Sequence, residues 1–115
     1  MKYLFLILSI PIQIHAQFNF QLGKNALKNN TTGIYNTAIG NACLSTNTSG
    51  VNNTALGAES LFRNYSGKDN TAVGYRSMYS NTSGESNAAF GFSSLSNNID
   101  AVSYTHLTLP TNREV

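Results

Sequence analysis

Few side chains in this sequence could carry acid–base chemistry, and their spacing keeps them apart. Between residues 17 and 100 the carboxylates are Glu59, Asp69, Glu85 and Asp100. They occupy different positions of a 17-residue repeat, whereas glycoside cleavage needs two carboxylates at a fixed separation. The nearest candidate is Asp69 beside Lys68, a pair that indicates a solvated turn. We therefore expect no catalytic residue and no enzymatic activity in the repeats.

Metal and cofactor chemistry lacks its usual ligands. Cys43 is the only thiol, and the two histidines, His15 and His106, lie outside residues 17–100. A zinc site needs several sulfur or nitrogen ligands, and the glycine patterns that cradle phosphate or bind calcium are missing. We expect no metal site, no cofactor and no disulfide. Cys43 stands where other copies of the repeat have Ala or Ser, which indicates a small buried side chain.

Composition points away from a charged partner. Only 10% of the 115 residues are charged and the formal net charge is +2, too little to indicate binding to nucleic acid or to a membrane surface. Trp is absent, while Asn, Ser, Thr and Gly are common. Such a chain is either disordered or folds as a repeat with a thin core and polar turns. The regularity of the repeat favours the second.

The repeat runs from residue 19 to residue 100, in four full copies and most of a fifth, without insertions. Position 1 is Asn in every copy (Asn19, Asn36, Asn53, Asn70 and Asn87), and position 12 is Asn as well (Asn30, Asn47, Asn64, Asn81 and Asn98). Position 4 is apolar (Leu22, Ile39, Leu56, Val73 and Phe90), and so is position 9 (Leu27, Leu44, Leu61, Met78 and Leu95). Position 3 is Ala after the first copy, and positions 5 and 15 are Gly.

These columns predict a mainly β repeat solenoid, of the parallel β-roll or β-helix kind, with one 17-residue coil per copy. We expect positions 4 and 9 to point inward, with Ala at position 3 letting the opposite wall approach. Gly would form the corners, and the Asn columns would hydrogen-bond along the stack. The stretch between position 5 and position 12 fits either a short helical turn or a second strand. Aromatic side chains are expected on the outside (Phe62, Tyr65, Tyr75, Tyr79 and Phe92).

The N-terminal segment has the pattern of an export signal. Lys2 precedes an almost wholly apolar run, Tyr3 to Ile14, which is too short to span a bilayer. The small residue Ala16 precedes an expected cleavage point at Gln17. We interpret residues 1–16 as a signal peptide and residues 17–100 as the mature repeat solenoid. The protein is then secreted or exposed on a bacterial cell surface, with no membrane span in its mature part.

Residues 101–115 do not continue the repeat. The run from 102 to 111 reads Val-Ser-Tyr-Thr-His-Leu-Thr-Leu-Pro-Thr. It resembles the translation of a transposon-based sequencing adapter over its whole length. The adapter begins with CT, and a native G followed by CT encodes Ala101, where the repeat predicts Gly, whose codons all begin with G. We therefore interpret residues 101–115 as a non-native tail and expect the natural protein to continue beyond Asp100.

The motif that starts each copy resembles a known family. Asn-Thr-Ala-Ile-Gly (36–40), Asn-Thr-Ala-Leu-Gly (53–57) and Asn-Thr-Ala-Val-Gly (70–74) are similar to the head repeats of trimeric autotransporter adhesins of the YadA-like family. The resemblance implies a trimeric parallel β-roll that binds a surface or host ligand. The period here is longer, and repeats of secreted tail-fibre proteins, which often precede an intramolecular chaperone domain, are closer still.

Two functional hypotheses follow. The first is a non-enzymatic structural or adhesive segment of a secreted or cell-surface fibre that acts as a homo-oligomer, a trimer by resemblance, without nucleic acid. The alternative is a stalk that presents a C-terminal chaperone or enzymatic domain. The sequence of the full-length gene would distinguish an adhesin from a tail fibre. A downstream β-barrel membrane anchor would favour the adhesin, and a self-cleaving chaperone domain would favour the tail fibre.

Overall fold

The structure, a computed structural model, describes residues 18–99 and, for the backbone alone, residues 105–107. The signal peptide predicted at residues 1–16 lies outside this part of the chain. Within the described residues every regular element is a β-strand, so the short helical turn that the sequence also allowed does not form there.

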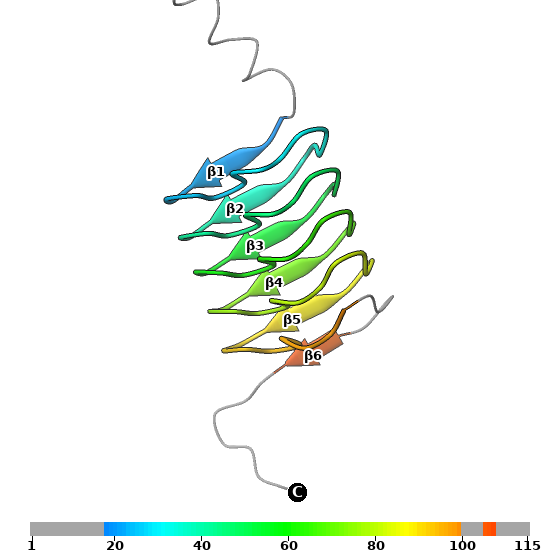
Figure 1. Cartoon of the computed structure of the whole chain (residues 1–115). Helices are drawn as coiled ribbons and strands as arrows, with labels where there is room; N and C mark the ends of the chain where they lie inside the picture. The colour runs from blue at the N-terminus through cyan, green and yellow to red at the C-terminus, as the bar shows by residue number, and fades with distance from the viewer. Residues whose placement is uncertain (1–17, 100–104, 108–115) are drawn as a thin grey trace, which may run out of the picture.

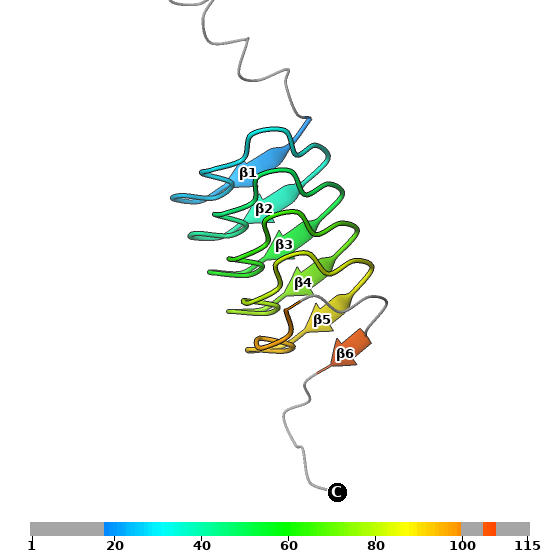
Figure 2. The same ribbon diagram turned by 45° about the vertical axis from the view of Figure 1, so that its right-hand side comes forward.

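Six strands of three residues each form one parallel sheet in chain order (Figure 1). They are β1 (Phe20–Leu22), β2 (Thr37–Ile39), β3 (Thr54–Leu56), β4 (Thr71–Val73), β5 (Ala88–Phe90) and β6 (Thr105–Leu107). Each residue pairs with the residue 17 positions later, as Ala38 does with Ala55 and Ala55 with Ala72. One strand per copy, always in the same register, confirms the predicted solenoid of 17-residue coils (Figure 2).

Strands β2 to β5 turn their central residue inward and their two outer residues outward. Ala38, Ala55, Ala72 and Ala89, at position 3, are fully buried, whereas Leu22, Leu56 and Phe90, at position 4, are exposed. The prediction that position 4 points inward is therefore wrong. Successive side chains of a strand point to opposite faces, so a buried Ala at position 3 forces position 4 to the outside. The small Ala is itself the core residue of this wall.

Position 9 supplies the large side chains of the core, as predicted. Leu44, Leu61 and Met78 are fully buried and pack with the Ala column into one hydrophobic cluster. Position 8 adds small residues to the same interior, where the hydroxyl of Ser60 donates to the carbonyl of Ala72 at 3.1 Å. The coil therefore holds one large apolar side chain between two narrow walls.

The wall opposite the strands is a run of turns, which we call the turn wall (residues 24–29, 41–46, 58–63, 75–80 and 92–97). Its backbone takes positive φ at position 7, as at Ala42 (59°), and again at position 9, as at Leu44 (51°). The amide of Leu44 donates to the carbonyl of Ser60 in the next coil at 3.0 Å. Reversals in the sign of φ thus let a non-strand segment bond to its neighbouring coil.

Two columns of buried Asn run along the stack, as the sequence predicts. At position 1, Asn53 Nδ2 donates to Asn36 Oδ1 at 3.0 Å and to the carbonyl of Gly67 at 2.8 Å. At position 12, Asn64 Nδ2 donates to Asn47 Oδ1 at 2.8 Å. These side chains satisfy backbone groups at corners where no strand partner is present, which buried polar groups require.

Glycine is required at position 5 by both conformation and space. Gly57 has a φ of 127°, and a Cβ there would lie 2.8 Å from the carbonyl oxygen of Gly74 in the next coil. An L-residue would be strained at this φ and would push the coils apart. The predicted role of Gly at this corner is therefore confirmed.

Strand β6 comes from the segment that the sequence indicates is non-native. Its backbone nevertheless pairs with β5 in the same 17-residue register, with Ala88 opposite Thr105 and Phe90 opposite Leu107. The unpaired edge of a parallel sheet offers a row of donors and acceptors to any extended segment. An in-register strand at this place is therefore compatible with either origin of residues 105–107.

Candidate interaction surfaces

The outer side of the sheet is a regular, uncharged surface, which we call the outer sheet face. It consists of position 2 (Phe20, Thr37, Thr54, Thr71 and Ala88) and position 4 (Leu22, Ile39, Leu56, Val73 and Phe90). Leu22 is 61% exposed, Leu56 40% and Phe90 37%, while Ile39 and Val73 are half-buried. Because strands lie about 4.8 Å apart, these apolar side chains form a continuous row along the solenoid.

The sequence pattern does not predict this row, because it assigns position 4 to the core. The signal that could have found it is the Ala between Thr and an aliphatic residue in the second, third and fourth copies. Strand alternation places either the central residue or the two outer residues inside, and only the first assignment buries the Ala at position 3. A row of apolar side chains on one exposed face is a common mark of an interaction site.

The turn wall carries a second cluster, made of aromatic rings and arginine. Phe62 stacks on Tyr79 with ring centroids 5.1 Å apart and nearly parallel planes, and Tyr75 stacks on Phe92 at 5.5 Å. The Arg76 guanidinium lies 5.0 Å from the Tyr79 ring centroid and 5.4 Å from that of Tyr75. Stacking between adjacent coils and cation–π contacts hold this cluster in place.

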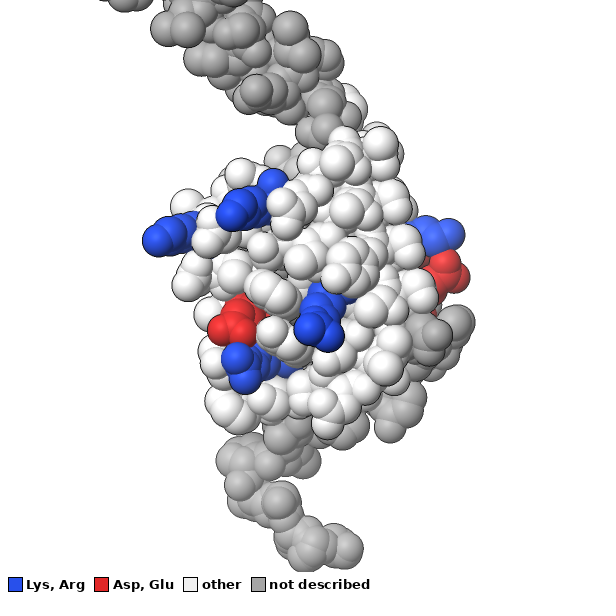
Figure 3. Space-filling model, in the orientation of Figure 1, with Lys and Arg blue, Asp and Glu red and all other residues white. Residues whose placement is uncertain are grey.

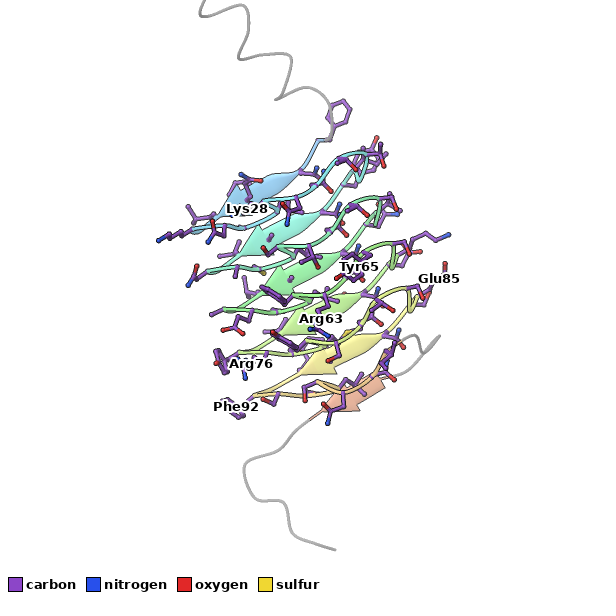
Figure 4. The ribbon with its side chains drawn as sticks, viewed as in Figure 1. Lys28, Arg63, Tyr65, Arg76, Glu85 and Phe92 are labelled. Atoms are coloured by element: carbon purple, nitrogen blue, oxygen red, sulfur yellow. The ribbon has the colours of Figure 1, made fainter. Side chains whose placement is uncertain are left out.

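The aromatic residues predicted on the outside are placed there to different degrees. Tyr65, Tyr75 and Phe92 are exposed, whereas Phe62 and Tyr79 are half-buried because they cover each other. Figure 4 labels Arg76 and Phe92 on neighbouring coils at the same border of the molecule. The sequence identified these residues but did not indicate that Arg76 joins the two stacks.

The corner formed by positions 16 and 17 holds Lys68 and Asp69. In the sequence, these two residues are the nearest candidate for a catalytic pair. Lys68 Nζ lies 3.0 Å from Glu85 Oε1 of the next coil, and the two side chains are 50% and 41% exposed. Asp69 instead accepts a hydrogen bond from Asn52 Nδ2 at 3.1 Å. The sequence neighbours Lys68 and Asp69 therefore bind different partners, each 17 residues away. Exposed contacts of this kind add little to stability and create no shielded site.

The Cys43 thiol is buried and donates to the carbonyl of Ala55 at 3.1 Å. Burial raises its pKa to about 12, partly opposed by a backbone hydrogen bond at Ile39. A neutral thiol in the core is a poor nucleophile and metal ligand. Cys43 thus occupies the small buried position that the sequence predicts.

The described residues hold no group of three His, Cys, Asp or Glu side chains placed to bind a metal ion. In the same part of the chain we find no helix with the length and apolar character needed to cross a bilayer. No protein-family model, curated protein or solved structure matches this chain.

Proposed function

We propose that this chain is a non-enzymatic structural or adhesive segment of a secreted fibre, and that copies of it associate through the outer sheet face. The observation that carries the proposal is the exposed apolar row at position 4, with Leu22, Leu56 and Phe90 at its exposed places. The row repeats without a charged residue on the whole outer sheet face.

A second copy of the chain is the partner that fits this face best. Its own outer sheet face has the same spacing along the solenoid, so apolar rows of two copies match coil for coil. Each coil also contains only one large core side chain, such as Leu61 or Met78, so a single solenoid buries little apolar surface. Packing of the rows against each other would add the apolar burial that one copy lacks.

The resemblance of residues 36–40, 53–57 and 70–74 to adhesin head repeats supports three copies and export. On this proposal the solenoid is a spacer or display surface. The absence of a repeating carboxylate pair supports a role without catalysis. A domain presented by this segment would carry any chemistry of the whole protein.

Light scattering coupled to gel filtration of the full chain tests the proposal. The wild-type chain is expected to elute with a molar mass that is a multiple of one copy, and Leu56→Glu is expected to be a monomer. Ala58→Glu is the matched control, because position 6 points outward and holds Lys24, Tyr75 or Phe92 in other copies. A wild-type monomer, or a Leu56→Glu variant of unchanged mass, would remove the proposed interface.

A further inference from the structure

The first coil differs from the next four at the centre of its strand. In coils two to five position 3 is Ala38, Ala55, Ala72 and Ala89, and each of these residues is fully buried. In the first coil it is Gln21, which is exposed. Gln21 is the register partner of Ala38, and paired residues of neighbouring parallel strands have their side chains on the same face of the sheet. Gln21 therefore stands at an inward position where the next four coils have Ala.

The backbone of the first coil is that of an interior coil. Phe18, at the place of position 17, has a φ of 48°, and Tyr35 (60°) and Asn52 (57°) have similar values at the ends of the first and second copies. Gly23 has a φ of 131°, close to the 135° of Gly40. The backbone thus gives no reason why a further coil could not precede the first. The side chains of the first coil must decide whether one can.

A further coil would enclose Gln21 as Ala38 is enclosed now, with a strand on each side and the turn wall opposite. In coils two to five this space holds only the methyl group of Ala. Gln adds a methylene and a carboxamide, which would overfill the interior and would need hydrogen-bond partners that an Ala-lined wall does not offer. The gain would also be small, because Ala26 and Leu27 of the first coil are already only 3% and 4% exposed.

Charge is the other feature that could close this end of the solenoid. The first coil contains Lys24 and Lys28, at positions 6 and 10. The Lys and Arg side chains are spread over the face shown in Figure 3 and do not gather at one place. At position 6 Tyr75 stacks on the ring of the next coil, and at position 10 Phe62 does the same. Large side chains at both positions are therefore compatible with stacked coils, so the lysines do not explain a stop.

The two ends of the sheet support the same assignment. Strand β5 has Ala89 at its centre and pairs with β6 in the 17-residue register, with His106 opposite Ala89. Among the strands that the structure describes, β1 and β6 are the two with a neighbour on one side only, and their central residues are Gln21 and His106. An Ala centre is therefore present in every described strand that has neighbours on both sides.

We infer that Gln21 ends the solenoid on its N-terminal side, so that neither a further coil nor the end of a second copy stacks on the first coil. The inference does not depend on the proposed self-association, but it limits its geometry. Copies that meet through the outer sheet face lie side by side and do not join end to end at β1. An unguarded strand edge would offer its donors and acceptors to any extended segment. Gln21 thus gives a stack of otherwise similar coils a defined start.

Insertion of an extra coil tests the inference. A copy of residues 53–69 is inserted before Asn19 of the full chain, once with Gln21 and once with Gln21→Ala. With Gln21 we expect no rise in the thermal midpoint and rapid trypsin cleavage after the inserted copy of Arg63. With Gln21→Ala the inserted coil should stack, which should raise the midpoint by about 8 °C or more and slow that cleavage at least about tenfold.

Three controls separate stacking from other effects. The same insertion before Asn53, between coils with Ala at position 3, should stack without any substitution. Lys24→Ala, at the outward position 6 of the first coil, should leave the coil inserted before Asn19 open to trypsin. Gln21→Ala without an insertion should shift the midpoint by less than about 4 °C, because Gln21 is exposed.

An inserted coil that resists trypsin with Gln21 in place would overturn the inference. So would a coil that stays equally open to trypsin after Gln21→Ala. Both measurements follow the folding of one chain, so they separate this inference from the proposed function. A chain that is monomeric but shows the expected effect of Gln21→Ala would reject only the self-association, and a chain that oligomerises without that effect would reject only the role of Gln21.

Discussion

Asn53 Oδ1 accepts two hydrogen bonds from Asn70, one from its backbone amide and one from its side-chain Nδ2, each at 3.1 Å. The same carboxamide donates to the carbonyl of Gly67 at 2.8 Å. One buried side chain thus provides a donor for the Gly67 carbonyl, at a corner of its own coil, and an acceptor for the Asn70 amide, at the start of the next strand. The column of such contacts links neighbouring coils where the sheet itself does not reach.

Replacing Asn53 by Ala should therefore cost about 2–4 kcal/mol of folding free energy, because the Asn70 amide loses its acceptor in a buried place. Urea unfolding measures this difference. Asn41→Ala is the control, since Asn41 is exposed on the turn wall, and it should change stability by less than about 0.5 kcal/mol. Equal losses at both positions would show that the column is not a structural element.

A second prediction concerns the strained backbone of the turn wall. Ala42 has a φ of 59°, a region that costs an L-residue about 1–2 kcal/mol and costs Gly almost nothing. Replacing Ala42 by Gly relieves this strain, but the greater conformational freedom of Gly in the unfolded chain offsets part of the benefit. Ala42→Gly should therefore stabilise the fold by up to about 1 kcal/mol. Ala58→Gly, at a position without positive φ, should destabilise it. The thermal midpoints of the two variants should move in opposite directions, and a shift in the same direction would count against this backbone.

A third prediction separates the two apolar columns. Leu61 is fully buried, and Leu61→Ala should cost about 2–5 kcal/mol. Leu56 is 40% exposed, and Leu56→Ala should cost less than about 1.5 kcal/mol at low protein concentration. Denaturant midpoints give both values. If Leu56→Ala lowered the free energy of unfolding as much as Leu61→Ala does, position 4 would have to be a core position.

The Cys43 thiol gives a pH-dependent prediction. Its pKa rises from 9.0 to about 12 on burial, so folding favours the neutral thiol. The stability from this group is fully present below about pH 9 and is lost as the pH rises toward 12. Cys43→Ser should remove that alkaline loss and stay folded, because Ser60 and Ser77 fill the same position. In native protein near pH 8 the thiol should not react with a disulfide reagent, and it should react once urea is added. Rapid reaction of native protein would show that Cys43 is accessible.

The period, the Asn columns and the Gly corners could be predicted from the sequence because each depends on one residue type repeated in register. Asn47 and Asn64 pair across the coils as their spacing indicates. Position 4 was placed wrongly because its apolar character was taken as a sign of burial. In a three-residue strand, alternation buries either the central residue or the two outer residues, and here the central Ala55 is buried.

The turn wall could not be predicted for a different reason. Positive φ at position 7 is held by Ala42, Glu59 and Arg76, none of which favours that region. Hydrogen bonds between coils, such as the one from the Glu59 amide to the Asn41 carbonyl at 2.9 Å, hold this backbone in place of local preference. The placement of Arg76 between two ring stacks follows from the same backbone. Tertiary context therefore decided both features.

Cross-linking tests the central claim, self-association through the outer sheet face, most directly. In a Cys43→Ser background, Leu56→Cys places one thiol on that face and Ala58→Cys places it on the turn wall. With a short bismaleimide, which joins one thiol from each of two chains, we expect covalent dimers from Leu56→Cys and monomer from Ala58→Cys, as separated on a denaturing gel. Equal yields from the two variants, or none from Leu56→Cys at concentrations where the chain is oligomeric, would contradict the claim.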